Sequence, residues 1–511
     1  MIEEKAKNSY QGVMKRDSLA AYLEQKEKII LASLLVVFIF FFTFLSFGRH
    51  LALKTYLNDL GTYDQAIWNT LQGHPFQLSC SMLEVKNYFS AHFSLILALF
   101  VPFYAIFSAP QWLLFFQVFS VALGGLPIYW VAKENLRSVG LALIFLASFF
   151  LNPFLHNGLL YDFHEVVLAV GLASFAFYFL EKKNNRLFAV FAVLLGLSQE
   201  HLPLLVFMMG LYAILAQKRY RFGFWISVLS LGYFLFVLFF IMPLFSSSGE
   251  PALIANSSIY PSRYSWLGNS LGEIMRNIFF HPLWVFLSLF TFSRINYLVL
   301  LILPLATFSL YAWPAIIALP LLAINLLSAN EMTFNIFFYH SAVIIPFLYF
   351  AAVLSLSRIF RGSHFFLRFF SSLILLSSVW MAYQYSVSPL SFRYGFSDYL
   401  PSLQAQKISE VRSKIPPEAS LSVQHNLGPH FSERQKIYRF PLKKEEAEYI
   451  LLSTFDPFAG NPRQIFGFEY ALQMNRLEWQ RDIEELKKSD KYELVYDKDG
   501  YLLFRNKQSK I

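Results

Sequence analysis

The stretch IILASLLVVFIFFFTFLSF (residues 29–47) decides the fold class of this chain. It carries no charged residue and is long enough to cross a bilayer as a helix. No small-residue cleavage pattern follows it, so we expect a retained anchor. Residues 1–28 are polar and contain six Lys or Arg side chains, which predicts a cytoplasmic N-terminal segment.

The rest of the chain repeats this apolar character. Of its 511 residues 56% are hydrophobic and 15% are charged, and the mean hydropathy is +0.46, which together indicate an integral membrane protein. The net charge of +9 falls in short basic clusters between apolar runs, where membrane orientation explains it better than nucleic acid does. Further apolar runs lie near 111–132, 139–155, 165–180, 187–201, 202–216, 222–245, 281–293, 296–327, 341–358 and 365–385. All should be helices, because a lone strand leaves its backbone unsatisfied in lipid.

The basic clusters orient these helices. They stay on the cytoplasmic side if residues 93–107 form a short helix at the outer interface and 296–327 form one crossing broken by prolines. We therefore predict a polytopic α-helical protein of the plasma (inner) membrane with about 11 transmembrane helices, its N-terminus inside and its C-terminus outside. The membrane domain spans 29–385, with outer loops at 48–110 and 246–280.

Polar residues gather at the predicted outer face. Ionisable side chains at bilayer depth are costly unless they face a cavity or a partner. We take as candidate substrate-binding residues Asp162, His164, Glu200, His201, Arg263, Arg276, Tyr339, His340 and Trp68. Simple solvation at the headgroup level, and mere loop charge for the two arginines, are the competing interpretations. The carboxylates and histidines would also suit a divalent metal such as Mg or Mn, although no regular ligand spacing is present.

Two carboxylates stand out in YLNDLGTYDQAIWNTLQGH (56–74), where the chain leaves its first crossing. Asp64 is a candidate general base, and a helix N-cap for the residues after it is the alternative. Asp59 is a second catalytic candidate, against a turn-forming role before Gly61. The single cysteine, Cys80, excludes an intramolecular disulfide.

The order of these features resembles the glycosyltransferase C superfamily, polytopic enzymes that use polyprenyl-phosphate sugars. The resemblance lies in a first crossing, an acidic motif (YDQAIWNTLQGH) that opens the outer loop, interfacial helices, and then HFSLIL, FSAPQWLLFFQ and GLPIYWVA. The chain is also similar from end to end to a prokaryotic family of predicted membrane proteins described as a domain of unknown function. DLGTYDQAIWNT, YDFHEVVLAV, LPLLAINLLS, YHSAVIIPFL and LGPHFSERQKIYRFP carry that similarity.

The superfamily resemblance implies a hexosyl or pentosyl transferase. It would move a sugar from a polyprenyl-phosphate donor to a lipid, glycan or protein acceptor outside the cytoplasm, with Asp64 at the position of the catalytic aspartate. Gln65 departs from the motif, since the superfamily often has a second acid there. Arginine suits bidentate contact with the donor phosphate.

Beyond residue 385 the apolar runs shorten to strand length. DKDG (497–500) between two alternating runs predicts a hairpin, and 469–488 reads as a polar helix. We expect a small extracytoplasmic α/β domain over 386–511.

Two other function classes stay open. A transporter would show charges near the midplane of several crossings and repeated halves, which are not evident. A non-catalytic membrane scaffold would tolerate replacement of the outer acids and histidines.

Overall fold

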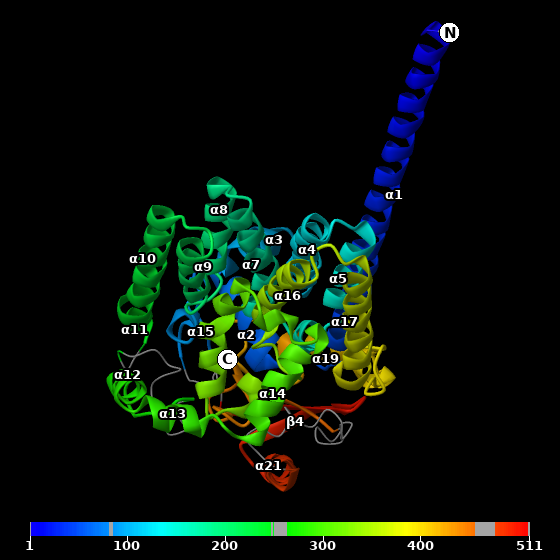
Figure 1. Ribbon diagram of the computed structural model, residues 1–511. Coiled ribbons are helices and arrows are strands. Elements are labelled where there is room, and N and C mark those ends of the chain that lie inside the picture. The colour runs from blue at the N-terminus through cyan, green and yellow to red at the C-terminus, as the bar shows by residue number, and fades with distance from the viewer. Residues whose placement is uncertain (1, 81–84, 247–248, 250–262, 455–475, 509–511) are drawn as a thin grey trace.

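The computed structural model describes residues 2–80, 85–246, 249, 263–454 and 476–508, and it shows a helical bundle with a small sheet at one end (Figure 1). The main bundle helices are α1 (Ile2–Leu51), α4 (Gln111–Leu136), α5 (Val139–Phe150), α6 (Pro153–Tyr161), α7 (Glu165–Glu181), α8 (Asn185–Gly196), α9 (Pro203–Leu215), α10 (Tyr220–Phe236), α16 (Ile345–Ile359) and α17 (His364–Tyr385). The N-terminal part of α1 projects beyond the bundle on the side away from the sheet. The predicted polytopic helical class is confirmed.

Five helices in the described part of the chain are long and apolar enough to cross a membrane. They are Gln25–Leu51, Gln111–Leu136, Tyr220–Phe245, Ala342–Ile359 and His364–Tyr385. Two bent pairs bring the number to seven if each pair counts as one span. Four shorter apolar segments of 10–17 residues include α8 and α9. The total of about eleven crossings therefore stays a prediction, because it counts shorter helices that are not long enough by this criterion.

The segment 281–327 differs from its prediction. Instead of a crossing near 281–293, α13 (Pro282–Ser288) is a seven-residue helix bent by 78° from the helix that follows, α14 (Phe292–Ile302). After α14 the chain makes short 3₁₀ turns with a left-handed break at Ala306 and Thr307, and then forms α15 (Leu319–Leu327).

This segment folds back on itself. The Arg294 Nε donates to the Leu326 carbonyl at 2.7 Å, so the start of α14 lies beside the end of α15. Between them, Phe308 packs against Phe360 at the α16–α17 turn, at the other end of the bundle. The predicted interruption is confirmed, but the single crossing is wrong. Proline and left-handed residues break the helix, and the chain returns toward the sheet as a second limb.

The segment predicted as an interfacial helix at 93–107 is short, as expected. It forms a 3₁₀ turn (Leu95–Phe100) that runs into α3 (Val101–Ile106). At about 1.5–2 Å of rise per residue it falls well short of the roughly 30 Å hydrocarbon core. It belongs to the first outer loop, together with a π-helical turn (Leu57–Gly61) and α2 (Thr62–Leu71).

The C-terminal residues form the predicted α/β domain. Its sheet has the order β2-β1-β3-β5-β4, with β1 (Leu421–Val423) parallel to β2 (Ile437–Arg439) and β3 (Tyr449–Ser453). The β4 (Tyr492–Lys498) and β5 (Tyr501–Asn506) strands form the expected hairpin, whose turn residues both have positive φ. The α21 helix (Arg476–Lys488) packs on this sheet through Trp479, and the residues before 476 in the predicted helix lie outside the described residues.

The sheet domain docks on the first outer loop. Leu57, Leu60 and Ile67 are fully buried in one apolar cluster with residues of β1 and of the turn after it. A Cβ on Gly428 would lie 2.5 Å from the Cβ of Leu57, so only glycine permits this close passage. The first outer loop is thus fixed between the bundle and the sheet.

Gly124 of α4 and Gly171 of α7 bring these two helices into close contact. A Cβ on Gly171 would lie 2.3 Å from the backbone oxygen of Ser120, whereas a Cβ on Gly232 of α10 would meet no atom within 4 Å. The start of α7 carries the polar residues described below, so this helix pair sets their position.

Replacing Gly171 with alanine should therefore destabilise the protein. We expect Gly171→Ala to lower the free energy of unfolding by about 1–3 kcal/mol, because the helices must separate to admit the methyl group. Thermal unfolding in detergent measures this. The matched control, Gly232→Ala, should unfold no earlier than wild type, and equal behaviour of the two variants would contradict the packing.

Candidate functional site

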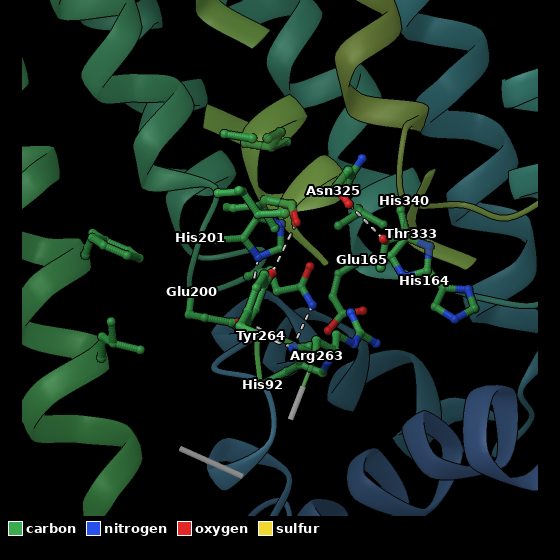
Figure 2. Close-up of a pocket in the computed structure, with 18 of the residues that line it drawn as sticks. His92, His164, Glu165, Glu200, His201, Arg263, Tyr264, Asn325, Thr333 and His340 are labelled. Carbon is green, nitrogen blue, oxygen red and sulfur yellow. Dashed lines mark hydrogen bonds and ion pairs between the residues drawn. The ribbon is translucent and has the colours of Figure 1, made fainter. Parts of the chain in front are cut away.

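A cavity of about 290 Å³ lies where the first outer loop meets the bundle (Figure 2). Its walls come from the start of α7, the α8–α9 turn, α10, α12 (Leu271–Phe280), α15 and the segment 330–340, with Tyr63 and His92 from the first outer loop. Segments far apart in the sequence thus supply one site.

One wall of the cavity is apolar. It is built by Phe234 and Leu238 of α10 and its continuation, Ile274 and Ile278 of α12, and Leu321 and Ile324 of α15. The other face of α12 exposes Met275, Phe279 and Phe280. The α12 helix therefore has apolar side chains toward the cavity and away from it, which suits a helix in contact with lipid.

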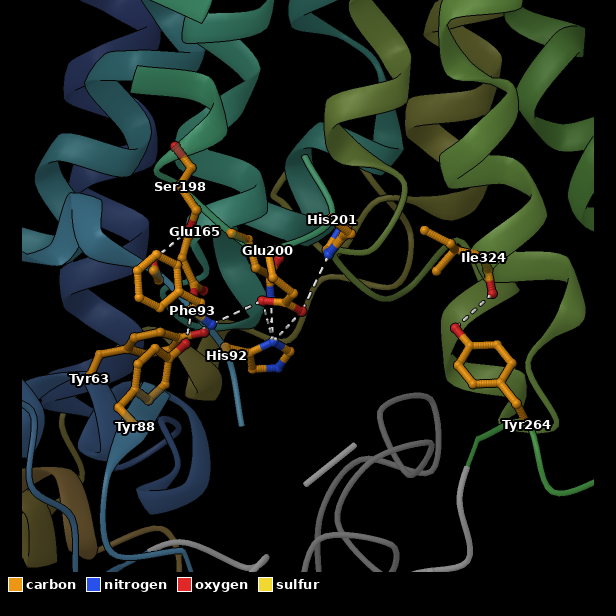
Figure 3. A network of polar contacts seen from close by, with 12 residues as sticks. Tyr63, Tyr88, His92, Phe93, Glu165, Ser198, Glu200, His201, Tyr264 and Ile324 are labelled. Carbon is orange, nitrogen blue, oxygen red and sulfur yellow. Dashed lines mark hydrogen bonds and ion pairs between the residues drawn. The ribbon is translucent and has the colours of Figure 1, made fainter. Parts of the chain in front are cut away.

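The opposite wall is polar, and its centre is Glu200 (Figure 3). Its carboxylate lies 3.1 Å from the Nδ1 of His92 and 3.6 Å from the Nδ1 of His201, and it accepts a hydrogen bond from the backbone N–H of Phe93 at 3.1 Å. Burial acts to raise the pKa of Glu200, but the two histidines outweigh it and the pKa is lowered. Burial likewise acts to lower the pKa of His92, but Glu200 raises it. The mutual attraction favours the ionised pair.

Glu165 is a second buried carboxylate on this wall. Tyr63 donates to its Oε2 at 2.5 Å, and Tyr88 donates to its Oε1. Both phenols belong to the first outer loop, whereas Glu165 begins α7. These bonds tie the loop to the bundle and hold the carboxylate in one orientation (Figure 3).

His164, the residue before Glu165, pairs with Asp59. The His164 Nε2 lies 3.2 Å from the Asp59 Oδ1, and the His164 Nδ1 is buried with no hydrogen-bond partner among the described residues. The imidazole stacks on the Tyr339 ring at a centroid distance of 3.3 Å. Asp59 keeps a side chain 22% exposed, and it does not itself line the cavity.

Arg263 is the only Arg or Lys among the described residues that line the cavity. Its carbonyl accepts from the Ala329 N–H at 2.7 Å, which anchors the backbone beside the end of α15. His340 also lines the cavity, and neither of its ring nitrogens has a partner among the described residues. Burial, together with Arg263 and the neighbouring histidines, keeps the pKa of His340 well below its usual value. Arginine and neutral imidazole give this wall cationic and hydrogen-bonding groups for an anion.

Six of the residues predicted from the sequence line the cavity. They are His164, Glu200, His201, Arg263, Tyr339 and His340. Asp162 lies just behind His164, where its carboxylate accepts from the Tyr56 N–H at 2.8 Å, and burial, with Asp59, raises its pKa. Trp68 packs against the core of the first outer loop, and Arg276 is exposed on α12; neither lines the cavity.

Sequence reasoning missed His92 and the apolar wall. His92 lies in a loop with no ligand spacing to mark it, and its partner Glu200 is 108 residues away. The apolar wall is indistinguishable in sequence from helix faces that meet lipid. Among the described residues no group of three His, Cys, Asp or Glu side chains is placed to hold a metal ion, and the divalent metal stays a prediction.

Asp64 lies away from the cavity, at the contact between α2 and the sheet domain. Its side chain is fully buried, and it accepts hydrogen bonds from the Tyr104 hydroxyl at 2.7 Å and the Ser432 hydroxyl at 2.6 Å. Burial, with the nearby Glu433, raises the pKa of Asp64 to about 7. The neighbouring Gln65 side chain donates to the Arg434 carbonyl at 2.8 Å across the same contact. In this geometry Asp64 joins two parts of the fold.

Comparisons with known proteins agree with this architecture. Residues 49–503 match the family described as "Predicted membrane protein (DUF2079)". The fold is similar to the crystal structure of ArnT from Cupriavidus metallidurans bound to undecaprenyl phosphate, with a TM-score of 0.52 and 12% identity over 94% of this chain and 98% of that one. The apo structure of ArnT gives the same TM-score and coverage at 10% identity. A search of the curated proteins gave no match.

The raised pKa of Asp64 makes stability depend on pH. In the folded state the carboxyl keeps its proton up to about pH 7, whereas in the unfolded chain it loses it near its ordinary value of 3.8. The folded state therefore holds more protons in between, and the free energy of unfolding falls as pH rises through this range. Asp64→Asn cannot ionise, so its melting temperature should rise relative to wild type from pH 4 to pH 7.

Thermal unfolding in detergent across this pH range tests the assignment. The control is Asp490→Asn, at an exposed position of the sheet domain, whose melting curve should follow wild type at every pH. Parallel pH dependence of wild type and Asp64→Asn would show that Asp64 is ionised in the folded protein.

Proposed function

The chain belongs to the DUF2079 family of predicted membrane proteins, and we propose that it is a membrane glycosyltransferase that takes its sugar from a polyprenyl-phosphate donor. The observation that carries this proposal is the two-sided cavity, in which an apolar wall faces carboxylates, histidines and one arginine. A polyprenyl-phosphate sugar has the same division, with a hydrocarbon tail at one end and an anionic, hydroxyl-rich group at the other. The ArnT fold, found with undecaprenyl phosphate bound, supports the donor class.

In this proposal the tail of the donor lies along α10, α12 and α15. An apolar groove offers the tail surroundings like those of the bilayer core, so the tail can enter it without exposing CH₂ groups to water. The phosphate then lies at Arg263, whose guanidinium offers paired N–H donors to its oxygens. The sugar is left against Glu165 and the Glu200 network, whose carboxylates accept hydrogen bonds from its hydroxyls.

Chemistry at this site requires two contributions. A base removes the proton of the acceptor hydroxyl as it attacks the anomeric carbon, and a cation stabilises the phosphate as the bond to it breaks. Asp64, predicted as the base, has both carboxylate oxygens engaged outside the cavity, so our proposal gives it the role of holding the first outer loop. In this proposal the reaction takes place on the extracytoplasmic side of the plasma membrane, an orientation that the basic N-terminal segment supports.

Binding of undecaprenyl phosphate tests the placement of the donor. We expect Arg263→Ala to weaken binding to the purified protein about tenfold to a hundredfold, the loss of a charge-assisted hydrogen-bonded pair. Arg276→Ala is the matched comparison, because Arg276 lies exposed on the following helix, α12, and outside the cavity, so this variant should bind like wild type. Native mass spectrometry in detergent measures both affinities. Equal losses for the two variants would indicate nonspecific charge attraction instead of a phosphate site.

The activity itself is tested in a strain deleted for this gene. Glycolipids and surface glycans are extracted after complementation with wild type or with the double variant Arg263→Ala/Glu165→Gln, at equal membrane levels. Wild type should restore a hexose- or pentose-sized mass that the variant restores poorly, because phosphate and sugar contacts are both removed. Full restoration by the variant would favour a scaffold over an enzyme.

A further inference from the structure

We propose that His164 is the general base of the transfer and that Asp59 fixes its tautomer, an assignment that rests on the glycosyltransferase function proposed above. The Asp59 Oδ1 and the His164 Nε2 share a hydrogen bond of 3.2 Å. This hydrogen bond determines which nitrogen of the neutral imidazole carries the proton.

A carboxylate can only accept hydrogen bonds, so the proton of the neutral imidazole lies on Nε2. The lone pair is then on Nδ1, the nitrogen that has no partner among the described residues. A buried imidazole nitrogen whose lone pair accepts no hydrogen bond lowers the stability of the folded protein. The same available lone pair is what a general base needs to accept the proton of a substrate hydroxyl. Asp59 also stabilises the imidazolium that forms when Nδ1 takes the proton.

The ring has little freedom to turn. Tyr339 stacks on one face of it, and the Tyr63 ring approaches at a centroid distance of 5.9 Å in an edge arrangement. The backbone is held as well, because the His164 N–H donates to the Gln117 Oε1 at 2.7 Å while the Gln117 Nε2 donates to the Asp162 carbonyl at 2.9 Å. Such support keeps a catalytic group in its productive geometry.

Position and competition also favour His164. It lines the cavity beside His340 on the polar wall (Figure 2). The two carboxylates of that wall are already engaged, Glu165 by two phenols and Glu200 by two histidines and a backbone N–H. To take a proton from a substrate hydroxyl, either carboxylate would have to give up part of these hydrogen bonds or its ion pairing. His164 is the group of this wall with an unused lone pair and a partner that stabilises its protonated form.

In the proposed step the acceptor oxygen forms a bond to the anomeric carbon as its O–H proton passes to the His164 Nδ1. The bond between that carbon and the phosphate oxygen breaks, and the electron pair leaves with the polyprenyl phosphate. The products are the glycosylated acceptor, the lipid phosphate and an imidazolium paired with Asp59, which returns its proton to solvent.

The test uses purified full-length protein mixed with detergent-solubilised membranes of the deletion strain, which contain donor and acceptor. Mass spectrometry follows the initial rate of the product that wild type forms. His164→Ala should lower this rate about a hundredfold or more, with undecaprenyl phosphate binding unchanged, and added imidazole should restore part of it. His281→Ala, at an exposed site outside the cavity, should match wild type.

Asp59 is tested as a positioning residue through a double-variant cycle. Asp59→Asn should lower the rate about tenfold or more in the wild-type background. It should have no further effect in the His164→Ala background, because Asp59 acts through His164; a merely structural role would lower the rate in both backgrounds.

The outcomes separate the two proposals. No product from wild type would overturn the glycosyltransferase function, and the base with it. Product from wild type together with an unimpaired His164→Ala would overturn the base alone, and so would a loss that imidazole does not reverse.

Discussion

The burial of α2 between the bundle and the sheet domain is the constraint on which the site depends. Successive residues of a helix point in different directions, so neighbouring residues of α2 contact different parts of the protein. Tyr63 turns toward the bundle, where it orients Glu165, while Asp64 turns toward the sheet domain and meets Ser432. One short helix therefore positions groups on both sides. Without the sheet domain, the first outer loop would lose the contacts of Asp64 and Gln65 with Ser432 and Arg434, whereas the bonds from its phenols to Glu165 come from the bundle.

The second general feature is the way charge is accommodated at the edge of an apolar bundle. Burying a single carboxylate without partners is expensive, but each buried carboxylate of the cavity has specific donors from another segment. His92 brings the first outer loop to the α8–α9 turn, and Tyr88 brings it to the start of α7. The same bonds that stabilise charge thus connect the loop to the bundle, so stability and site geometry have a common origin.

The sequence predicted the helical class, the sheet domain and most of the polar wall, because hydropathy and turn patterns are local. Prediction from the sequence failed where contacts between residues far apart in the chain determine the structure. The run 296–327 carries no charged residue, and although its prolines indicate a break, no local pattern predicts that Arg294, just before the run, will meet Leu326 and fold the segment into two limbs. Asp64 carries a suggestive motif, but its environment is set by Ser432, which lies 368 positions further along the chain.

The contact between α2 and the turn after β1 has a consequence for biogenesis. A ribosome delivers the first outer loop to the membrane long before it synthesises Ser432 and Arg434, the residues that bind Asp64 and Gln65. During translation the side chains of Asp64 and Gln65 therefore stay without these partners until the sheet domain has been synthesised. The described residues that line the cavity end at His340, so the chain synthesises the cavity wall before the residues that fix the other side of α2.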